Sequence, residues 1–277
     1  MTVILALLAA VSYGVSDFTG GLASRRRAAV TVLLTSYPVG AVFMCMMLLL
    51  LPGQLGLRTA ALGAAGGVAG MLGVILMYSA LAVAPMNVVS PITAVLAATV
   101  PVLYGVVIGE RPRGVVWLGI ALGIGAVLLV SRAPADHPHG PVPTRVLLMA
   151  LASGVGFGLY FVCLAGTDHG SGAWPVVISR VTSAVLILPL AWRTGRLGVL
   201  HGRLLALSVV TGIFDAAANL FFLIASRHGY VSLASVITSL YPAVTVLLAA
   251  GVLRERAGRL QQVGLGLAAV SVVLITY

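Results

Sequence analysis

Charged side chains occur at three places inside long apolar segments of this sequence. Asp215 lies about twelve residues from each end of its segment, and Asn219 follows one helical turn later on the same face. Arg180 lies about two turns inside the preceding segment, and Asp17 lies in the first segment, one turn after Tyr13. A charge within an apolar span is costly, so such residues are candidates for binding a substrate or an ion.

Each of these charges has more than one interpretation. A carboxyl group removed from water can exchange a proton near physiological pH, so Asp215 is a candidate for proton coupling or for binding a substrate ammonium group. Alternatively, Asp215 forms a structural ion pair with Arg180 that fixes two helices together. Arg180 could instead bind a substrate carboxylate through both guanidinium arms. Asp17 could belong to the same pathway, or it could be a solvated or arginine-paired residue near Arg25–Arg27.

Hydroxyl and aromatic residues could complete such a pathway. Two Ser/Thr pairs occupy corresponding positions in the two halves of the chain, where their hydroxyls could bind substrate or bond back to carbonyls of their own helix. Tyrosines in nearby segments are further candidates for lining a cavity. With one asparagine, these additional candidates are Tyr78, Asn87, Ser90, Thr93, Tyr160, Ser235, Thr238 and Tyr241.

The composition predicts that membrane-spanning helices hold these residues. The chain is 60% hydrophobic and 8% charged, with a mean hydropathy of +1.14, and its apolar runs of about 18–25 residues suit a bilayer crossing. We predict an all-α polytopic membrane protein with ten transmembrane helices. Their expected ranges are 2–22, 29–51, 59–84, 86–109, 115–130, 145–166, 173–192, 203–226, 230–253 and 259–277.

An internal duplication relates the two halves. The only two glutamates, Glu110 and Glu255, are 145 residues apart, and each is followed by arginine. We interpret these glutamates as elements of helix-end packing and orientation. The pattern predicts a first repeat at 1–132, a linker at 133–143 and a second repeat at 144–277. Because each repeat has an odd number of helices, the second must be inverted, as in secondary transporters that alternate access to a central site.

Charge and cysteine usage exclude other classes. All 16 basic residues are arginines, and 15 lie near breaks between apolar runs, which is typical of orientation signals rather than of a nucleic-acid-binding face. Eleven follow odd-numbered helices and four follow even-numbered ones, which favours termini outside the cell. The two cysteines have no ligand partners at metal-site spacing, so we expect no metal and no cofactor.

The sequence resembles the EamA-type transporters of the drug/metabolite transporter superfamily along essentially its whole length. The resemblance rests on the five-plus-five repeat, on Gly109-Glu110-Arg111-Pro112 and Arg254-Glu255-Arg256, and on the aromatic-glycine pairs Tyr13-Gly14 and Phe157-Gly158. Pro242 stands where the family usually has proline, whereas the matched residue of the first half is Ala97, so that any kink there moves to Pro101.

The resemblance implies a secondary transporter that moves a small metabolite or drug-like solute, such as an amino acid or nucleobase, often outward across the cytoplasmic membrane of a prokaryote. The expected partners are this solute, a proton and the lipid bilayer, with the chain as a monomer or homodimer. The family usually has both termini inside, in conflict with the arginine count, so orientation stays open. A membrane enzyme would need a catalytic His or a close acid pair within the spans, and neither is apparent. A channel or lipid scramblase is the alternative.

Overall fold

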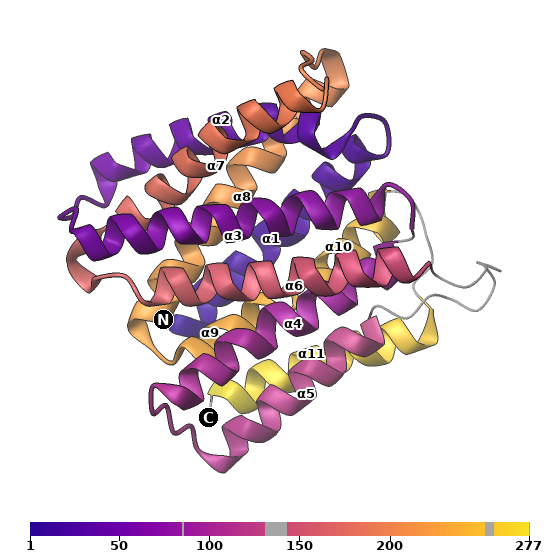
Figure 1. The fold of residues 1–277 in the computed structure, drawn as a ribbon. Coiled ribbons are helices and arrows are strands. Elements are labelled where there is room, and N and C mark those ends of the chain that lie inside the picture. Colours follow the sequence, from indigo (N-terminus) through magenta and orange to yellow (C-terminus); the bar gives the residue numbers. More distant parts are fainter. Residues whose placement is uncertain (85, 131–142, 253–257, 277) are drawn as a thin grey trace.

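The computed structural model describes residues 1–84, 86–130, 143–252 and 258–276, and these residues form helices joined by short connections (Figure 1). The predicted linker, except Pro143, and Glu255 lie outside the described residues. The helices of the first half are α1 (Thr2–Ser24), α2 (Ala29–Leu50), α3 (Leu57–Leu81), α4 (Met86–Val107) and α5 (Gly114–Val130). Those of the second half are α6 (Thr144–Ala165), the 3₁₀ turn η1 (His169–Ser171), α7 (Trp174–Arg193), α8 (Gly202–His228), α9 (Val231–Thr238), α10 (Tyr241–Val252) and α11 (Arg259–Thr276).

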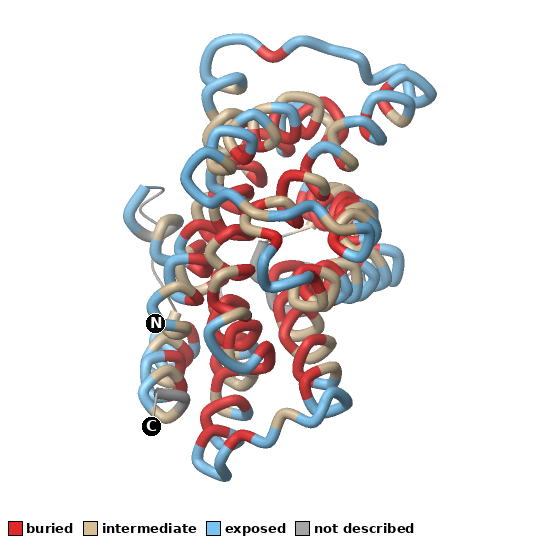
Figure 2. The backbone as a smooth tube through the Cα atoms, turned by 90° about the vertical axis from the view of Figure 1, so that its left-hand side faces the viewer, coloured by how far each residue is buried: buried red, intermediate tan, exposed pale blue. Residues whose placement is uncertain are grey.

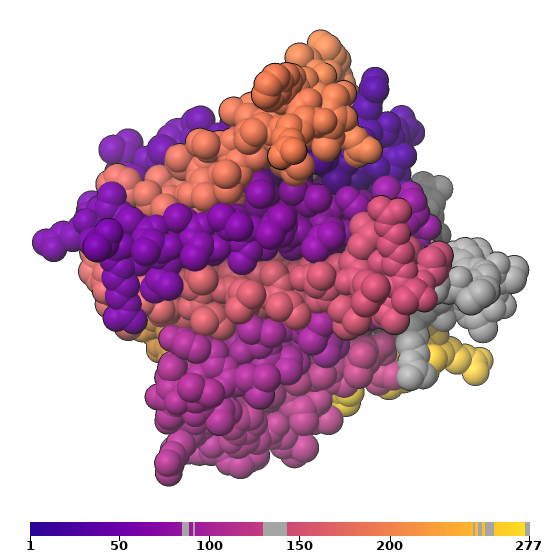
Figure 3. Space-filling model, in the orientation of Figure 1, coloured from indigo at the N-terminus to yellow at the C-terminus, as the bar shows by residue number. Residues whose placement is uncertain are grey.

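The two halves interleave rather than sit side by side. Each helix of the first half packs on helices of the second: α1 on α8 and α10, α2 on α7 and α8, α3 on α6 and α7, α4 on α6 and α9, and α5 on α11. If α1–α3 are matched with α6–α8, α4 with α9 and α10, and α5 with α11, this set of pairs is unchanged when the two halves are exchanged. Figure 3 shows one result on the surface, where α6 lies between α3 and α4. Any site in the middle of the bundle is therefore built from both halves.

The outer surface of the bundle is apolar. Six helices among the described residues (α1, α2, α3, α6, α7 and α8) are long and apolar enough to cross a membrane, and four shorter apolar stretches accompany them. Large hydrophobic side chains face outward, including Leu49 and Leu57, which are 84% and 88% exposed. Figure 2 shows the buried backbone toward the centre and the exposed backbone at the periphery. Because lipid is as apolar as leucine, such a surface suits a bilayer.

The two ends of the bundle are distinguished by the chain termini. Both termini lie at one end, with residues 51–56, 166–173 and 229–230, and we call this end the terminal face (Figures 1 and 2). At the opposite end, residues 25–28 and 194–201 connect helices. The described arginines of that end are the eight at 25–27, 145, 193, 196, 203 and 259, and those of the terminal face are Arg58, Arg111, Arg113 and Arg227.

One predicted helix is wrong. The expected single helix over 230–253 is two helices, α9 and α10, separated by a turn at Ser239 and Leu240. Pro242 gives the physical reason, because it has no N–H to bond the carbonyl of Thr238 and its ring would clash with that carbonyl. Within the first turn of α10 the same proline costs little. In the first half, α4 remains one helix from Met86 to Val107 with Pro101 inside it, so no break matches that of the second half.

The end of α4 holds the start of α9. Gly109 has a φ of +90°, its N–H bonds the carbonyl of Val106 (3.1 Å), and the N–H of Glu110 bonds the carbonyl of Gly105 (2.9 Å). This pattern is a Schellman motif, which needs a residue with positive φ and so favours glycine. The motif turns Glu110 back toward α9.

Glu110 caps α9 across the repeat boundary. Its carboxylate accepts hydrogen bonds from the N–H of Val231 (2.6 Å), the N–H of Ser232 (3.1 Å) and the hydroxyl of Ser232 (2.6 Å). Two of the N–H groups that a helix start leaves unpaired are thus satisfied, and the negative charge lies at the positive end of the helix dipole. The carboxylate fits beside Gly105, where a Cβ would overlap it. Glu110 therefore has the helix-end packing role expected from the sequence.

We expect Glu110→Ala to lower the free energy of unfolding by about 1–2 kcal/mol, because α9 loses its charged cap. Thermal unfolding of the purified protein in detergent measures the effect. Arg58→Gln, at an exposed position of the same face, is the control and should leave the midpoint unchanged. Equal midpoints for Glu110→Ala and the native protein would show that the cap is dispensable.

Candidate substrate site

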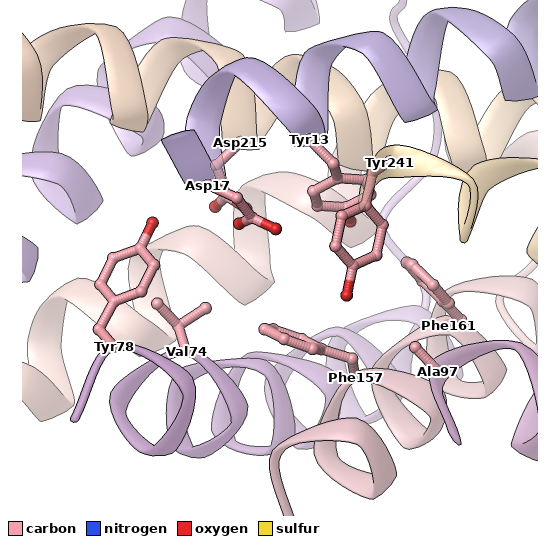
Figure 4. Close-up of a pocket in the computed structure, with 9 residues that line it drawn as sticks. All are labelled: Tyr13, Asp17, Val74, Tyr78, Ala97, Phe157, Phe161, Asp215 and Tyr241. Carbon is pink, nitrogen blue, oxygen red and sulfur yellow. The ribbon is translucent and has the colours of Figure 1, made fainter. Parts of the chain in front are cut away.

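A pocket lies in the middle of the bundle between the two halves. The empty space among its lining side chains is about 360 Å³, any open solvent at its mouth included. The centre of a water-sized sphere can move through only about 20 Å³ of that space, so the pocket is narrow in this state. Helices α1, α3, α4, α6, α8 and α10 contribute to it. The lining residues are Tyr13, Asp17, Val74, Tyr78, Ala97, Phe157, Phe161, Asp215 and Tyr241 (Figure 4).

Asp215 forms an ion pair with Arg180 while still lining the pocket. Nη1 of Arg180 donates to Oδ2 of Asp215, joining α7 to α8. Nη2 of Arg180 donates to the hydroxyl of Tyr160 (3.2 Å), and the guanidinium lies over the rings of Tyr37 and Tyr160 at 5.7 and 5.6 Å. Arg180 is 4% exposed. The structure thus contains the ion pair that was one of the two interpretations of Asp215.

Asp17 has no such partner. Its side chain is 8% exposed and lines the pocket, yet it has no hydrogen bond or ion pair within the described part of the chain. Figure 4 shows the carboxyl groups of Asp17 and Asp215 at the same end of the pocket. The alternative in which Asp17 is a solvated or arginine-paired mouth residue is therefore wrong. The fold also brings two acids to one pocket, although the sequence shows no close acid pair.

Asn219 links the aromatic wall of the pocket to α8. The hydroxyl of Tyr13 donates to Oδ1 of Asn219, and Nδ2 of Asn219 donates to the backbone carbonyl of Asp215 (2.6 Å). Asn219 is fully buried and does not line the pocket itself. It therefore positions Tyr13, which shares its pocket with Asp17 as their spacing predicted.

The predicted hydroxyl residues lie outside the pocket lining. The hydroxyl of Thr93 donates to the carbonyl of Val89 (3.0 Å), and that of Ser235 donates to the carbonyl of Ser232 (2.9 Å), so both bond back to their own helix. Thr238 is buried with its hydroxyl unpartnered. Two further candidates are buried as well, namely Ser90 and Tyr160.

Several lining residues were not singled out from the sequence as site residues. Val74, Ala97, Phe157 and Phe161 are ordinary apolar residues of an apolar helix, and only their tertiary position distinguishes them. Phe157 had one signal, since it begins the second aromatic-glycine pair. The space at Gly158 is filled by α4, because a Cβ there would overlap Val100. Gly158, the second residue of this pair, therefore permits the close approach of α6 to α4 beside Phe157.

At the terminal face, two loops pair through their backbones. The N–H of Gln54 bonds the carbonyl of Gly170 (3.0 Å), and the N–H of Ala173 bonds the carbonyl of Leu51 (3.1 Å). Gly172 lies between these bonds with a φ of +54°, and a Cβ there would overlap the backbone of Leu51 and Pro52. Glycine is therefore required for this contact between the α2–α3 and α6–α7 connections.

Arg227, near the end of α8, ties the same loops to the bundle. Nη1 donates to the carbonyl of Gly172 (2.9 Å), and Nη2 donates to the carbonyl of Asp168 (3.0 Å) and to the hydroxyl of Ser171 (2.6 Å). The carboxylate of Asp168 accepts a hydrogen bond from the hydroxyl of Thr59 at the start of α3 (2.9 Å). Residues of both halves thus join at this face.

Two aspartate substitutions should have opposite effects on stability. Asp215→Asn leaves the buried guanidinium of Arg180 without its counter-charge, so we expect the free energy of unfolding to fall by about 3–5 kcal/mol. Asp17→Asn removes a buried carboxylate that has no partner, so the melting temperature at pH 8 should rise. Thermal unfolding of both variants beside the native protein tests this. A lower midpoint for Asp17→Asn would reveal a stabilising partner.

Comparison with known proteins gives the family. Residues 1–132 and 144–277 match the EamA-like transporter family. No curated protein matches this chain. A solved crystal structure has the same fold, with a TM-score of 0.79 at 18% identity over 99% of this chain and 96% of the other. Because the family match covers nearly the whole chain, this multi-pass membrane protein belongs to the EamA-like transporter family.

Proposed function

We propose that this protein is a secondary active transporter that carries a small solute through the central pocket by alternating access. The observation that carries the proposal is a pocket at the centre of the bundle, lined by both halves and containing two acidic side chains. A carrier needs such a site between two units that can move relative to each other. The helix pairs stay the same when the two halves are exchanged. This symmetry supports an inverted repeat, in which each half can adopt the conformation of the other.

The structure has features of a state closed at the terminal face. Helices α6 and α8 both end at that face, and Phe161 and Phe222 near their ends are stacked with centroids 4.2 Å apart. The ring of Tyr13 lies 5.9 Å from that of Phe161. Together with the loop contacts and Arg227, these rings lie between the pocket and the terminal face. We propose that they part when the carrier changes state, and that transport is outward across the cytoplasmic membrane.

Filling the pocket should abolish transport. Val74 is 8% exposed and lines the pocket, whereas Val68 on the same helix is 38% exposed. In cells that overexpress the protein, we expect a solute class to accumulate in the medium, and Val74→Trp to return it to the level of cells without the protein. Metabolite profiling of medium and cytosol measures this.

Val68→Trp is the matched control, with the same substitution on the outer surface, and should export like the native protein. Membrane levels and melting temperatures are compared first. Equal export by folded Val74→Trp would refute the pocket as the pathway. Reconstituted protein should also exchange the identified solute against a trans gradient, a counterflow that a channel or scramblase does not show.

Locking the terminal face should stop the cycle. A Cβ at Gly170 would meet nothing within 4 Å, and the backbone of Gly170 already bonds that of Gln54, so a disulfide between Gln54→Cys and Gly170→Cys is feasible. In a background with Cys45→Ser and Cys163→Ser, oxidation should reduce transport by about tenfold or more, and reduction should restore it, because the closed state is trapped. The single-cysteine variants are the controls. Full transport by the cross-linked protein would show that this face never opens.

A further inference from the structure

The buried charges of the site do not balance. When both are ionised, Asp17 and Asp215 carry two negative charges, and Arg180 is the cation paired with them, through Asp215. The remaining carboxylate, Asp17, faces the pocket without a hydrogen bond from the described residues. An ion out of water without a partner costs several kcal/mol. The pocket therefore requires one more positive charge.

The groups around Asp17 do not supply this charge. Helix α8 presents Asp215, α3 presents Tyr78 and α10 presents Tyr241, while Tyr13 lies on α1 itself. Tyrosine hydroxyls are neutral near pH 7, and α9 carries no titratable side chain. On α2, Tyr37 lies over Arg180. A proton or a cationic solute must therefore neutralise Asp17.

The walls favour an organic cation. Five of the nine lining residues are aromatic, and aromatic faces attract cations as well as apolar groups. A zwitterion such as an amino acid would also need a positive partner for its carboxylate. Arg180 does not line the pocket, and both of its terminal nitrogens are bonded, to Asp215 and Tyr160; only its Nε has no partner among the described residues. The guanidinium therefore does not offer the pocket a pair of free terminal nitrogens for a substrate carboxylate.

We propose that Asp17 binds the ammonium group of a monovalent organic cation with an apolar or aromatic body, and that a proton competes with this solute for the same carboxylate. The inference rests on the proposed transport function and names its substrate class. Because Asp17 accepts either a proton or the cation, the two exchange across the membrane in opposite directions. The protonated amine leaves Asp17 as a proton arrives, so charge in the site is conserved.

The test uses four probes that share one aromatic ring, namely phenethylamine (cation), phenylalanine (zwitterion), 2-phenylethanol (neutral) and 3-phenylpropionate (anion). Calorimetry with the full-length protein in detergent measures binding from pH 5.5 to pH 8.5. Phenethylamine, which stays protonated over this range as a lysine side chain does, should bind at least about tenfold more tightly than the other three. As the pH falls, its affinity should decrease and approach a tenfold loss per pH unit, because one proton replaces one cation.

Asp17→Asn should weaken phenethylamine binding by about thirtyfold or more and remove its pH dependence. Asp17→Glu keeps the charge and is the conservative control, which should retain pH-dependent binding, and Val68→Trp is the control on the outer surface. Melting temperatures verify that each variant is folded. Failure of phenethylamine to bind at any pH, tighter binding of phenylalanine, or native binding by Asp17→Asn would each overturn the inference.

This outcome is separable from that of the transport proposal. If phenethylamine binds as expected but reconstituted protein shows no exchange, the transport proposal fails and the inference about Asp17 stands. If Val74→Trp blocks export of a neutral or anionic solute, the transport proposal stands and the inference about the substrate class fails.

Discussion

The charge arrangement at the centre of the bundle is the constraint on which the site depends. Among the described residues, two acidic side chains and one basic side chain lie at the centre of the bundle, and the ion pair between Arg180 and Asp215 neutralises two of these three charges. The pair joins α7 to α8, and its guanidinium is further held by Tyr160 on α6 and covered by Tyr37 on α2. Asp17 on α1 is left as the unpaired charge. If all three charges were paired with one another, they would form a purely structural network. The unpaired carboxylate of Asp17 can instead bind a proton or a ligand.

Helix ends organise the bundle around this centre. In lipid, every backbone group must find a partner within the protein. The break between α9 and α10 is tolerated because it is buried among other helices, and the start of α9 is capped by Glu110 from the other half. Glycines at 109 and 172 permit the turns that these end contacts need. These contacts connect the two halves at the terminal face, where a carrier must be able to close.

The choice between interpretations of single residues depended on distance. Thr93 and Ser235 looked like symmetric pathway residues, but their hydroxyls bond carbonyls of their own helices. Asp215 looked like the principal free acid, and the fold pairs it with an arginine 35 residues away. Asp17 looked weaker because of the arginines that follow it, yet its side chain lines the pocket and forms no ion pair with them. Neighbours in sequence did not indicate neighbours in space.

The sequence by itself determined the class of the protein. Apolar runs of bilayer length, a repeat marked by the only two glutamates, and charges inside the runs suffice for a helical membrane protein of two halves, because these features depend on local composition and spacing. The tertiary structure decided which charges meet, since that depends on how helices from the two halves pack. It also decided the break near Pro242. The matching helix α4 has its proline, Pro101, only one turn away from the corresponding position and is uninterrupted, so the sequence alone did not predict which of the two helices is broken. Pairing energies act between side chains distant along the chain, and only packing brings them within reach.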